Sequence, residues 1–157
     1  MKNIWISGTI NSGKTTVSKL IGKELKMPVI ELDSFSAFVE DWMEFSDLMA
    51  LNYSLLPEIV EMYNKRGFGI IIVYPLSEKR YVEMGELRDS FEFFAIDPGI
   101  EMALTERGER KLTDWERNRI SELYKSGINK PSFATWVDTS THIPSETAEG
   151  IISLLSK

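Results

Sequence analysis

A glycine-rich pattern near the N-terminus constrains the fold of this chain more than any other feature. Residues 8–15 read Gly-Thr-Ile-Asn-Ser-Gly-Lys-Thr, which matches G-x-x-x-x-G-K-[ST] at every fixed position. An apolar, β-prone run at residues 4–6 precedes the pattern, and apolar residues recur at helical spacing over residues 17–25. A turn in this context points backbone N–H groups and a helix N-terminus at an anion. The pattern therefore predicts a strand, a phosphate-binding loop and a helix in succession.

The same loop predicts which parts of a nucleotide the chain binds. Lys14 supplies a mobile cation for the β- and γ-phosphates, and the Thr15 hydroxyl is a ligand of the kind that Mg²⁺ takes beside them. Thr16 lies in the first helical turn, within reach of the α-phosphate. We therefore expect binding of ATP or GTP with Mg²⁺. The expected nucleotide-binding residues of the loop are Gly8, Thr9, Asn11, Ser12, Gly13, Lys14, Thr15 and Thr16.

The rest of the chain alternates between strand-like apolar runs and helical patterns, with no hairpin signal between any two strands. Residues 70–73 are all β-branched, which is typical of a parallel strand buried on both faces. We predict a three-layer α/β sandwich with a parallel sheet, formed by residues 1–157 as one domain. The five expected strands cover residues 4–6, 29–32, 70–73, 91–96 and 133–137.

Polar residues at the expected helix starts predict three caps. Thr113 and Glu116 have the spacing of a capping box. Asp97, which is followed by proline, predicts a capped helix directly after the fourth strand. Ser145 is expected to cap the last helix of the chain.

Composition excludes several classes of protein. The chain carries a net charge of −6 with a pI near 4.9, which argues against the basic groove of a nucleic-acid-binding protein. It contains no cysteine, which excludes disulfides and thiolate metal sites. No apolar run reaches membrane-spanning length, and the N-terminal run is too short for a signal peptide. We therefore expect a cytoplasmic protein without a membrane partner.

Four short segments occur in an order that is found in one group of enzymes. They are the phosphate pattern within residues 6–16, Leu32-Asp33-Ser34, the arginines at 107 and 110, and residues 137–140. With these segments the chain resembles the small P-loop kinases of the shikimate kinase, gluconate kinase and chloramphenicol phosphotransferase group. The resemblance implies a P-loop NTPase sheet with strand order 2-3-1-4-5. It also implies a helical acceptor cover at residues 34–66 and a lid at residues 106–117.

The resemblance further implies roles for side chains outside the phosphate loop. Asp33 would accept the proton of the acceptor hydroxyl, or hold Mg²⁺ through water, at the carboxyl ends of the strands. Arg107 and Arg110 would bring positive charge to the transferring phosphoryl group, and Arg107 would also contact the nucleotide. Thr141 and Pro144 would line the adenine. The implied catalytic residues are Lys14, Asp33, Arg107 and Arg110, and the implied metal ligands are Thr15 and Asp33.

These assignments have structural alternatives. Asp33 or Ser34 also precedes a helical pattern and would then serve as a helix cap. The segment of residues 107–111 alternates in charge, as solvated surface segments do. The single histidine, His142, is expected to be exposed rather than catalytic.

An acid that many phosphate-loop proteins carry is missing. The third strand ends in Val73-Tyr74-Pro75, where such proteins place an aspartate that helps to hold Mg²⁺. This departure favours a second hypothesis, in which the chain is a nucleotide-binding regulatory or interaction protein with little or no catalysis. A third hypothesis, a nucleic-acid 5′-kinase, would need the basic groove that the composition argues against.

The expected acceptor cover, residues 34–66, bears on the substrate. Its helical spacing predicts that most of its aromatic side chains pack in the core. These aromatic residues are Phe35, Phe38, Trp42, Phe45 and Tyr53, and the first four belong to one predicted helical stripe across residues 35–49. No arginine or lysine lies between residues 27 and 64, so the cover offers no clamp for a carboxylate. We therefore expect the γ-phosphate of ATP to pass to a hydroxyl group of a neutral or weakly charged small molecule, with the oligomeric state left open.

Overall fold

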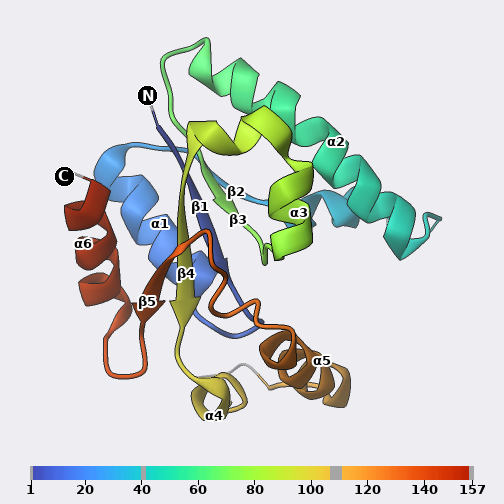
Figure 1. The fold of residues 1–157 in the computed structure, drawn as a ribbon, viewed down its shortest axis with the longest axis vertical. Coiled ribbons are helices and arrows are strands. Elements are labelled where there is room, and N and C mark those ends of the chain that lie inside the picture. The colour runs from blue at the N-terminus through green and yellow to red at the C-terminus, as the bar shows by residue number, and fades with distance from the viewer. Residues whose placement is uncertain (1, 40–41, 107–110, 156–157) are drawn as a thin grey trace.

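A parallel sheet runs through the centre of the computed structural model, which describes residues 2–39, 42–106 and 111–155 (Figure 1). All neighbouring strands are parallel, and the order in the sheet confirms the expected one. From edge to edge, the five strands are β2 (Val29–Glu31), β3 (Ile71–Val73), β1 (Asn3–Gly8), β4 (Phe91–Asp97) and β5 (Thr135–Asp138).

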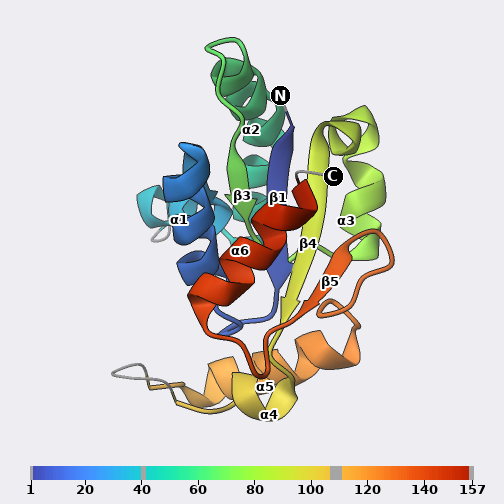
Figure 2. The same ribbon diagram turned by 90° about the vertical axis from the view of Figure 1, so that its left-hand side faces the viewer.

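Helices cover both faces of the sheet, as the sequence predicts. Figure 2 shows α1 (Lys14–Leu25) and α6 (Pro144–Leu155) together on one face. The opposite face carries α2 (Phe45–Asn64), α3 (Glu78–Glu83) and the 3₁₀-helix η2 (Gly85–Ser90). No helix among the described residues is both long and apolar enough to cross a membrane.

The central strands contribute apolar side chains to two separate cores. Ile4 and Ile6 of β1 pack with α1 and α6, whereas Trp5 between them packs with α2 on the other face. Ile71 and Ile72 of β3 divide in the same way. Because successive side chains of a strand point to opposite faces, a strand between two helical layers is apolar at every position.

Two further helices lie past the carboxyl ends of the strands (Figure 2). They are α4 (Ile100–Ala103) and α5 (Asp114–Lys125). A small third core of Ala103, Leu112 and Ile120 holds them together. The predicted capping box starts α5, since the Thr113 hydroxyl accepts from the Glu116 amide and the Glu116 carboxylate accepts from the Thr113 amide.

The predicted helical stripe across residues 35–49 is wrong. The structure has a 3₁₀-helix, η1 (Leu32–Phe38), then a turn, and then the single long helix α2. Phe38 and Trp42 are 81% and 72% exposed, so they do not belong to the core. Helical periodicity does not continue through a turn, and residues on its two sides therefore do not share a face.

Two predicted caps are also wrong. The last helix begins at Pro144, one residue before Ser145, and the Glu146 carboxylate accepts from the backbone amide of Ile143. The short helix α4 begins after Gly99, not after Asp97. The Asp97 carboxylate does accept a hydrogen bond from the Gly99 amide. Asp97 is, however, the last residue of β4, and its other hydrogen bonds join it to residues far along the chain.

Asp97 joins β4 to the segment that carries α5. Its buried carboxylate accepts hydrogen bonds from Tyr124 Oη at 2.7 Å, Asn129 Nδ2 at 2.9 Å and Trp136 Nε1 at 3.2 Å. Burial alone would raise the pKa of Asp97, but these bonds and the one from Gly99 outweigh it and lower the pKa below 3.8. The charged form of Asp97 is therefore the form that stabilises the fold.

We expect Asp97→Asn to lower the free energy of unfolding by about 1–3 kcal/mol at neutral pH. The asparagine NH₂ group is a donor, and it would face groups that themselves donate hydrogen bonds to Asp97. A carboxyl group with a lowered pKa stabilises above its unfolded pKa, and the contribution is lost as the pH falls through the folded value. The difference in the free energy of unfolding between wild type and variant should therefore become smaller below pH 3.8. Urea unfolding at neutral and acidic pH measures it, and Asp89→Asn, at a side chain 78% exposed, is the matched control.

A second expectation concerns the contact of α1 with β2. A Cβ at Gly22 would lie 2.4 Å from Val29 Cγ2 and 2.8 Å from the Met27 carbonyl oxygen. Gly22→Ala should therefore cost about 1–3 kcal/mol of stability through overpacking. Gly150 in α6 has nothing within 4 Å of such a Cβ. Gly150→Ala should stabilise by about 0.5–1 kcal/mol, so equal effects of the two variants in urea unfolding would contradict the described packing.

Candidate active site

The phosphate loop, residues 8–15, turns sharply from β1 into α1. Gly8 has φ 146°, and a Cβ there would lie 2.5 Å from the Ile96 carbonyl oxygen and 2.8 Å from Ser12 Oγ. Only glycine fits this position, because a backbone atom of the neighbouring strand β4 blocks any side chain. The turn leaves the N-terminal end of α1 facing a cavity of about 460 Å³.

Most of the predicted loop residues line this first cavity. Gly8 and Thr9, at the start of the loop, are buried and do not line the cavity. Lys14 Nζ donates to the Thr9 carbonyl oxygen at 2.6 Å, so the lysine lies across its own loop. The predicted residues that line the cavity are Asn11, Ser12, Gly13, Lys14, Thr15 and Thr16.

The Asn11 side chain has a role that the sequence does not reveal. Its Nδ2 donates to the carbonyl oxygens of Ala103 at 2.9 Å and Thr105 at 3.0 Å. Asn11 also has φ 59°, a left-handed conformation that asparagine tolerates. Its amide nitrogen therefore ties the phosphate loop to the end of α4, directly before the predicted lid.

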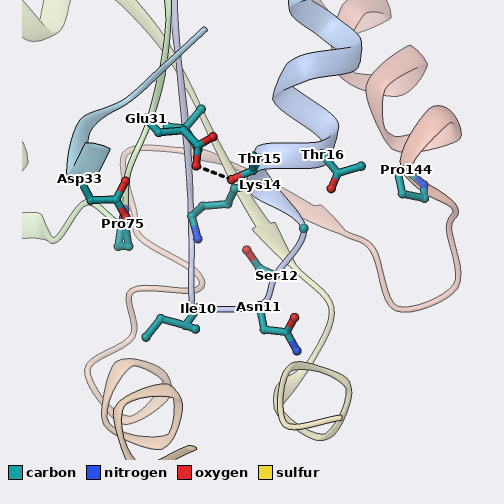
Figure 3. Close-up of a pocket in the computed structure, with 12 residues that line it drawn as sticks. Ile10, Asn11, Ser12, Lys14, Thr15, Thr16, Glu31, Asp33, Pro75 and Pro144 are labelled. Carbon is teal, nitrogen blue, oxygen red and sulfur yellow. Dashed lines mark hydrogen bonds between the residues drawn. The ribbon is translucent and has the colours of Figure 1, made fainter. Parts of the chain in front are cut away.

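Sequence reasoning missed Glu31 at the end of β2. Its Oε2 accepts a hydrogen bond of 2.9 Å from the Thr15 hydroxyl (Figure 3), and its other oxygen lies 3.7 Å from Lys19 Nζ. The signal that could have found it is the Glu-x-Asp spacing to Asp33. An acid at the carboxyl end of a parallel strand lies at the edge of the sheet where ligands bind.

Asp33 lines the first cavity on the side opposite Thr16 and Pro144 (Figure 3). Burial and then the negative charge of Glu31 raise its pKa above 3.8, against the effects of its own backbone amide and of Lys14. Asp33 is the second residue of η1. Its carboxyl group thus faces a cavity, near a carboxylate and an ammonium group.

A second cavity, of about 560 Å³, adjoins the first. The two share three lining residues, which are Ile10, Asp33 and Pro75. Helix α2 contributes apolar side chains to the second cavity, and α5 contributes others from across it. Arg80 of α3 and Arg119 of α5 also line it. Asp33 therefore stands at the junction of a phosphate-loop cavity and a mainly apolar one.

The remaining predicted site residues have mixed positions. Pro144 lines the first cavity, whereas Thr141 is exposed and lines neither cavity. Arg107 and Arg110 lie outside the described residues. His142 is exposed, which confirms the expectation for it.

The end of β3 carries no acid, as the sequence indicates. Val73 is the last strand residue, and Tyr74 and Pro75 follow it. Trp5 Nε1 donates a hydrogen bond of 2.8 Å to the Tyr74 carbonyl oxygen, and Tyr74 lines the second cavity. The carboxylate hydrogen-bonded to Thr15 therefore comes from β2 rather than from β3.

Solved structures resemble this arrangement over nearly the whole chain. A sugar kinase from Janibacter sp. has a TM-score of 0.75 at 17% identity, with 99% of this chain and 95% of that chain covered. Shikimate kinase from Acinetobacter baumannii, in complex with shikimate, has a TM-score of 0.72 at 15% identity, with 99% and 93% covered. The APS kinase of Mycobacterium tuberculosis, in complex with AMPPNP and APS, has a TM-score of 0.64 at 21% identity, with 99% of this chain and 98% of that chain covered.

The chain has the fold of the small P-loop kinases. This confirms the fold class and the group that the sequence resembles. No protein-family model and no curated protein matches the sequence itself. At 15% to 21% identity the likeness to these three kinases is one of fold, and the chemistry has to be argued from the residues of this chain.

The neighbouring carboxyl groups yield a direct test of the site geometry. In carboxyl ¹³C NMR titrations, Asp33 should titrate above 3.8. Glu31→Gln should lower that pKa by removing one negative charge, while burial keeps its own part of the shift. Glu24→Gln, an exposed change on α1, should leave the pKa unchanged. An Asp33 pKa that is the same in wild type and Glu31→Gln would mean that the two groups do not face each other.

Proposed function

We propose that this protein is an ATP-dependent phosphotransferase that moves the γ-phosphate of ATP to a hydroxyl group of a small molecule. One observation carries the proposal: Asp33 lines both the phosphate-loop cavity and the adjoining apolar cavity. A carboxylate at such a junction can meet a phosphoryl group from one side and an acceptor hydroxyl from the other. This is the geometry that direct transfer between two bound substrates needs.

The first cavity suits the triphosphate. The N-terminus of α1 and the loop amides supply partial positive charge, and Lys14 supplies a full one. The cover over residues 34–66, the lid over 106–117 with Arg107 and Arg110, and a cytoplasmic location remain part of the proposal. The lid proposal draws support from Arg117, which bonds Glu106 at 3.0 Å.

Mg²⁺ fits the oxygen donors beside the loop. The Thr15 hydroxyl is held by the Glu31 carboxylate, and both face the same cavity as Asp33. Mg²⁺ is commonly held by one or two protein oxygens together with substrate phosphates, so these three side chains suffice for it. When bound, the ion would neutralise charge on the phosphate oxygens. Glu31 from β2 would then take the place of the missing acid after β3 in holding Mg²⁺. This weighs against the hypothesis of a nucleotide-binding protein with little or no catalysis.

The transfer step can be written with the side chains present. The acceptor oxygen bonds to the γ-phosphorus as the bond from that phosphorus to the β,γ-bridging oxygen breaks, and ADP leaves. The hydroxyl proton passes to Asp33. The raised pKa of Asp33 makes its carboxylate a better proton acceptor than that of an ordinary aspartate. Lys14 lies close enough to influence that carboxylate and to meet the transferring charge.

The test is transfer from γ-labelled ATP with Mg²⁺ to a panel of hydroxylated metabolites, sugars, nucleosides and aminoglycosides. We expect Asp33→Asn to lower kcat by roughly a hundredfold or more, because a general base is removed. Lys14→Met should weaken ATP binding. Asp47→Asn and Lys23→Met, at exposed positions outside both cavities, are the matched controls.

Two outcomes would contradict the proposal. Tight ATP binding without transfer to any acceptor would favour the nucleotide-binding regulatory protein. Transfer that Asp33→Asn leaves intact would show that the junction of the two cavities is not where the reaction takes place.

A further inference from the structure

Side chains from two other elements hold the carbonyl groups at the end of α4. At the C-terminal end of a helix, carbonyl oxygens have no partner within the helix. Here Asn11 Nδ2 donates to the carbonyl oxygens of Ala103 at 2.9 Å and Thr105 at 3.0 Å. The Leu104 carbonyl oxygen between them accepts from Arg117 Nη1 at 3.0 Å. Successive carbonyl groups are therefore bonded alternately to the phosphate loop and to α5.

The Asn11 side chain is suited to this role. Its NH₂ group has two donors and both are used, so a reversed amide would place Oδ1 against two carbonyl oxygens. Figure 3 shows its amide nitrogen pointing away from Lys14, toward the olive ribbon of α4. Its backbone φ of 59° is one that asparagine, aspartate and glycine adopt most readily. The phosphate-loop pattern accepts any residue at this position, so phosphate binding does not itself require asparagine.

Arg117 attaches the first turn of α5 to the same segment. In addition to its bond to the Leu104 carbonyl oxygen, its Nη2 pairs with Glu106 Oε1 at 3.0 Å. A guanidinium carries its donors in a rigid planar fork, so two bonds fix its direction. The segment of residues 103–106 therefore lies between Asn11 on one side and Arg117 on the other.

Apolar packing joins the same three elements. Ile10, next to Asn11 in the loop, packs against the core of Ala103, Leu112 and Ile120. Ala103 belongs to α4 and Ile120 belongs to α5. Two adjacent side chains of the phosphate loop thus contact the same neighbouring segment, one by apolar packing and the other by hydrogen bonds.

The position of α5 matters for the second cavity. Trp115, Arg119 and Leu123 of α5 line this cavity, and the first two lie within two residues of Arg117. Transfer between two bound substrates needs the reacting atoms at about 3–3.5 Å from each other, and a displacement of about 1 Å can be costly. The wall that α5 forms therefore has to keep its place relative to the phosphate loop.

The other end of α5 has an attachment of its own. Tyr124 Oη donates to the Asp97 carboxylate at 2.7 Å, which holds the last turn of the helix to β4. A helix that is held at one end can still pivot about that end. The bonds of Asn11 and Arg117 at the first turn are therefore not made redundant by Asp97.

We propose that Asn11 and Arg117 are positioning residues that fix the first turn of α5, and with it Trp115 and Arg119, at a set distance from the phosphate loop. The bonds of this link involve only protein groups, so the link does not need a nucleotide. Its importance for phosphoryl transfer rests on the proposed function, whereas the link itself does not.

Distances between spin labels measure the link directly. The chain has no cysteine, so Lys23→Cys on α1 and Asp114→Cys at the start of α5 provide the label sites, both at exposed positions. In pulsed electron–electron double resonance we expect one narrow distance distribution, with the same centre before and after addition of AMPPNP and Mg²⁺. Asn11→Gly and Arg117→Met should each widen this distribution, because the first turn of α5 then moves relative to α1.

Two aspartate variants separate the amide bonds from the loop conformation. Aspartate also adopts the left-handed φ of position 11, but its carboxylate has no N–H to donate. Asn11→Asp should therefore widen the distribution at least as much as Asn11→Gly does. Asn118→Asp, the same change at an exposed position of α5, is the matched control and should leave the distribution unchanged.

Two further readouts locate the effect. Hydrogen exchange of the Leu104 and Thr105 amides, followed by NMR, should be roughly tenfold faster in Asn11→Gly, because two hydrogen bonds at the end of α4 are lost. With an acceptor found by the transfer assay, Arg117→Met should raise the KM for that acceptor by a larger factor than the KM for ATP, since α5 lines the second cavity.

Three results would overturn this inference: a wild-type distribution as wide as that of Asn11→Gly, a centre that moves when AMPPNP is added, or a width in Asn11→Asp equal to that in wild type. A narrow distribution that depends on Asn11 and Arg117, in a protein that transfers phosphate to no acceptor, would leave the inference standing and count against the kinase. Transfer that depends on Asp33, with label distances that ignore Asn11, would do the reverse.

Discussion

The close contact between the backbone at Gly8 and strand β4 is the constraint on which the site depends. A Cβ at this position would lie 2.5 Å from the Ile96 carbonyl oxygen, so only glycine fits at the end of β1. The turn that follows sets the start of α1 against the carboxyl end of the central strand. The partial charge of the helix end, the loop amides and Lys14 then gather on one cavity.

The sheet order places the other groups around that cavity. Strand β2 lies two places from β1, with β3 between them, so Glu31 reaches Thr15 from a strand that β1 does not touch. Asp33 follows two residues later, in η1, and lines both the phosphate-loop cavity and the apolar one. Burial and then the charge of Glu31 raise the pKa of Asp33, and shifted pKa values are common among groups that handle protons.

The far wall of the apolar cavity depends on an interaction remote from it. Asp97 at the end of β4 holds Tyr124 of α5, and α5 carries both Trp115 and Arg119. The Asn11 amide ties the phosphate loop to the end of α4 on the other side. The helices past the strand ends are therefore fixed to the sheet by polar contacts from two directions, and the small core around Ile120 completes their attachment.

The sequence by itself determined the local features of this protein, namely the phosphate loop, the five strands, their parallel arrangement and the capping box at Thr113. Each of these depends on residues close in the chain or on an apolar period. Tertiary structure alone decided the Thr15–Glu31 contact, the buried bonds of Asp97 and the arrival of Arg80 and Arg119 at one cavity. Such contacts join residues far apart in the chain, and no local pattern records which strand ends and helices meet in space.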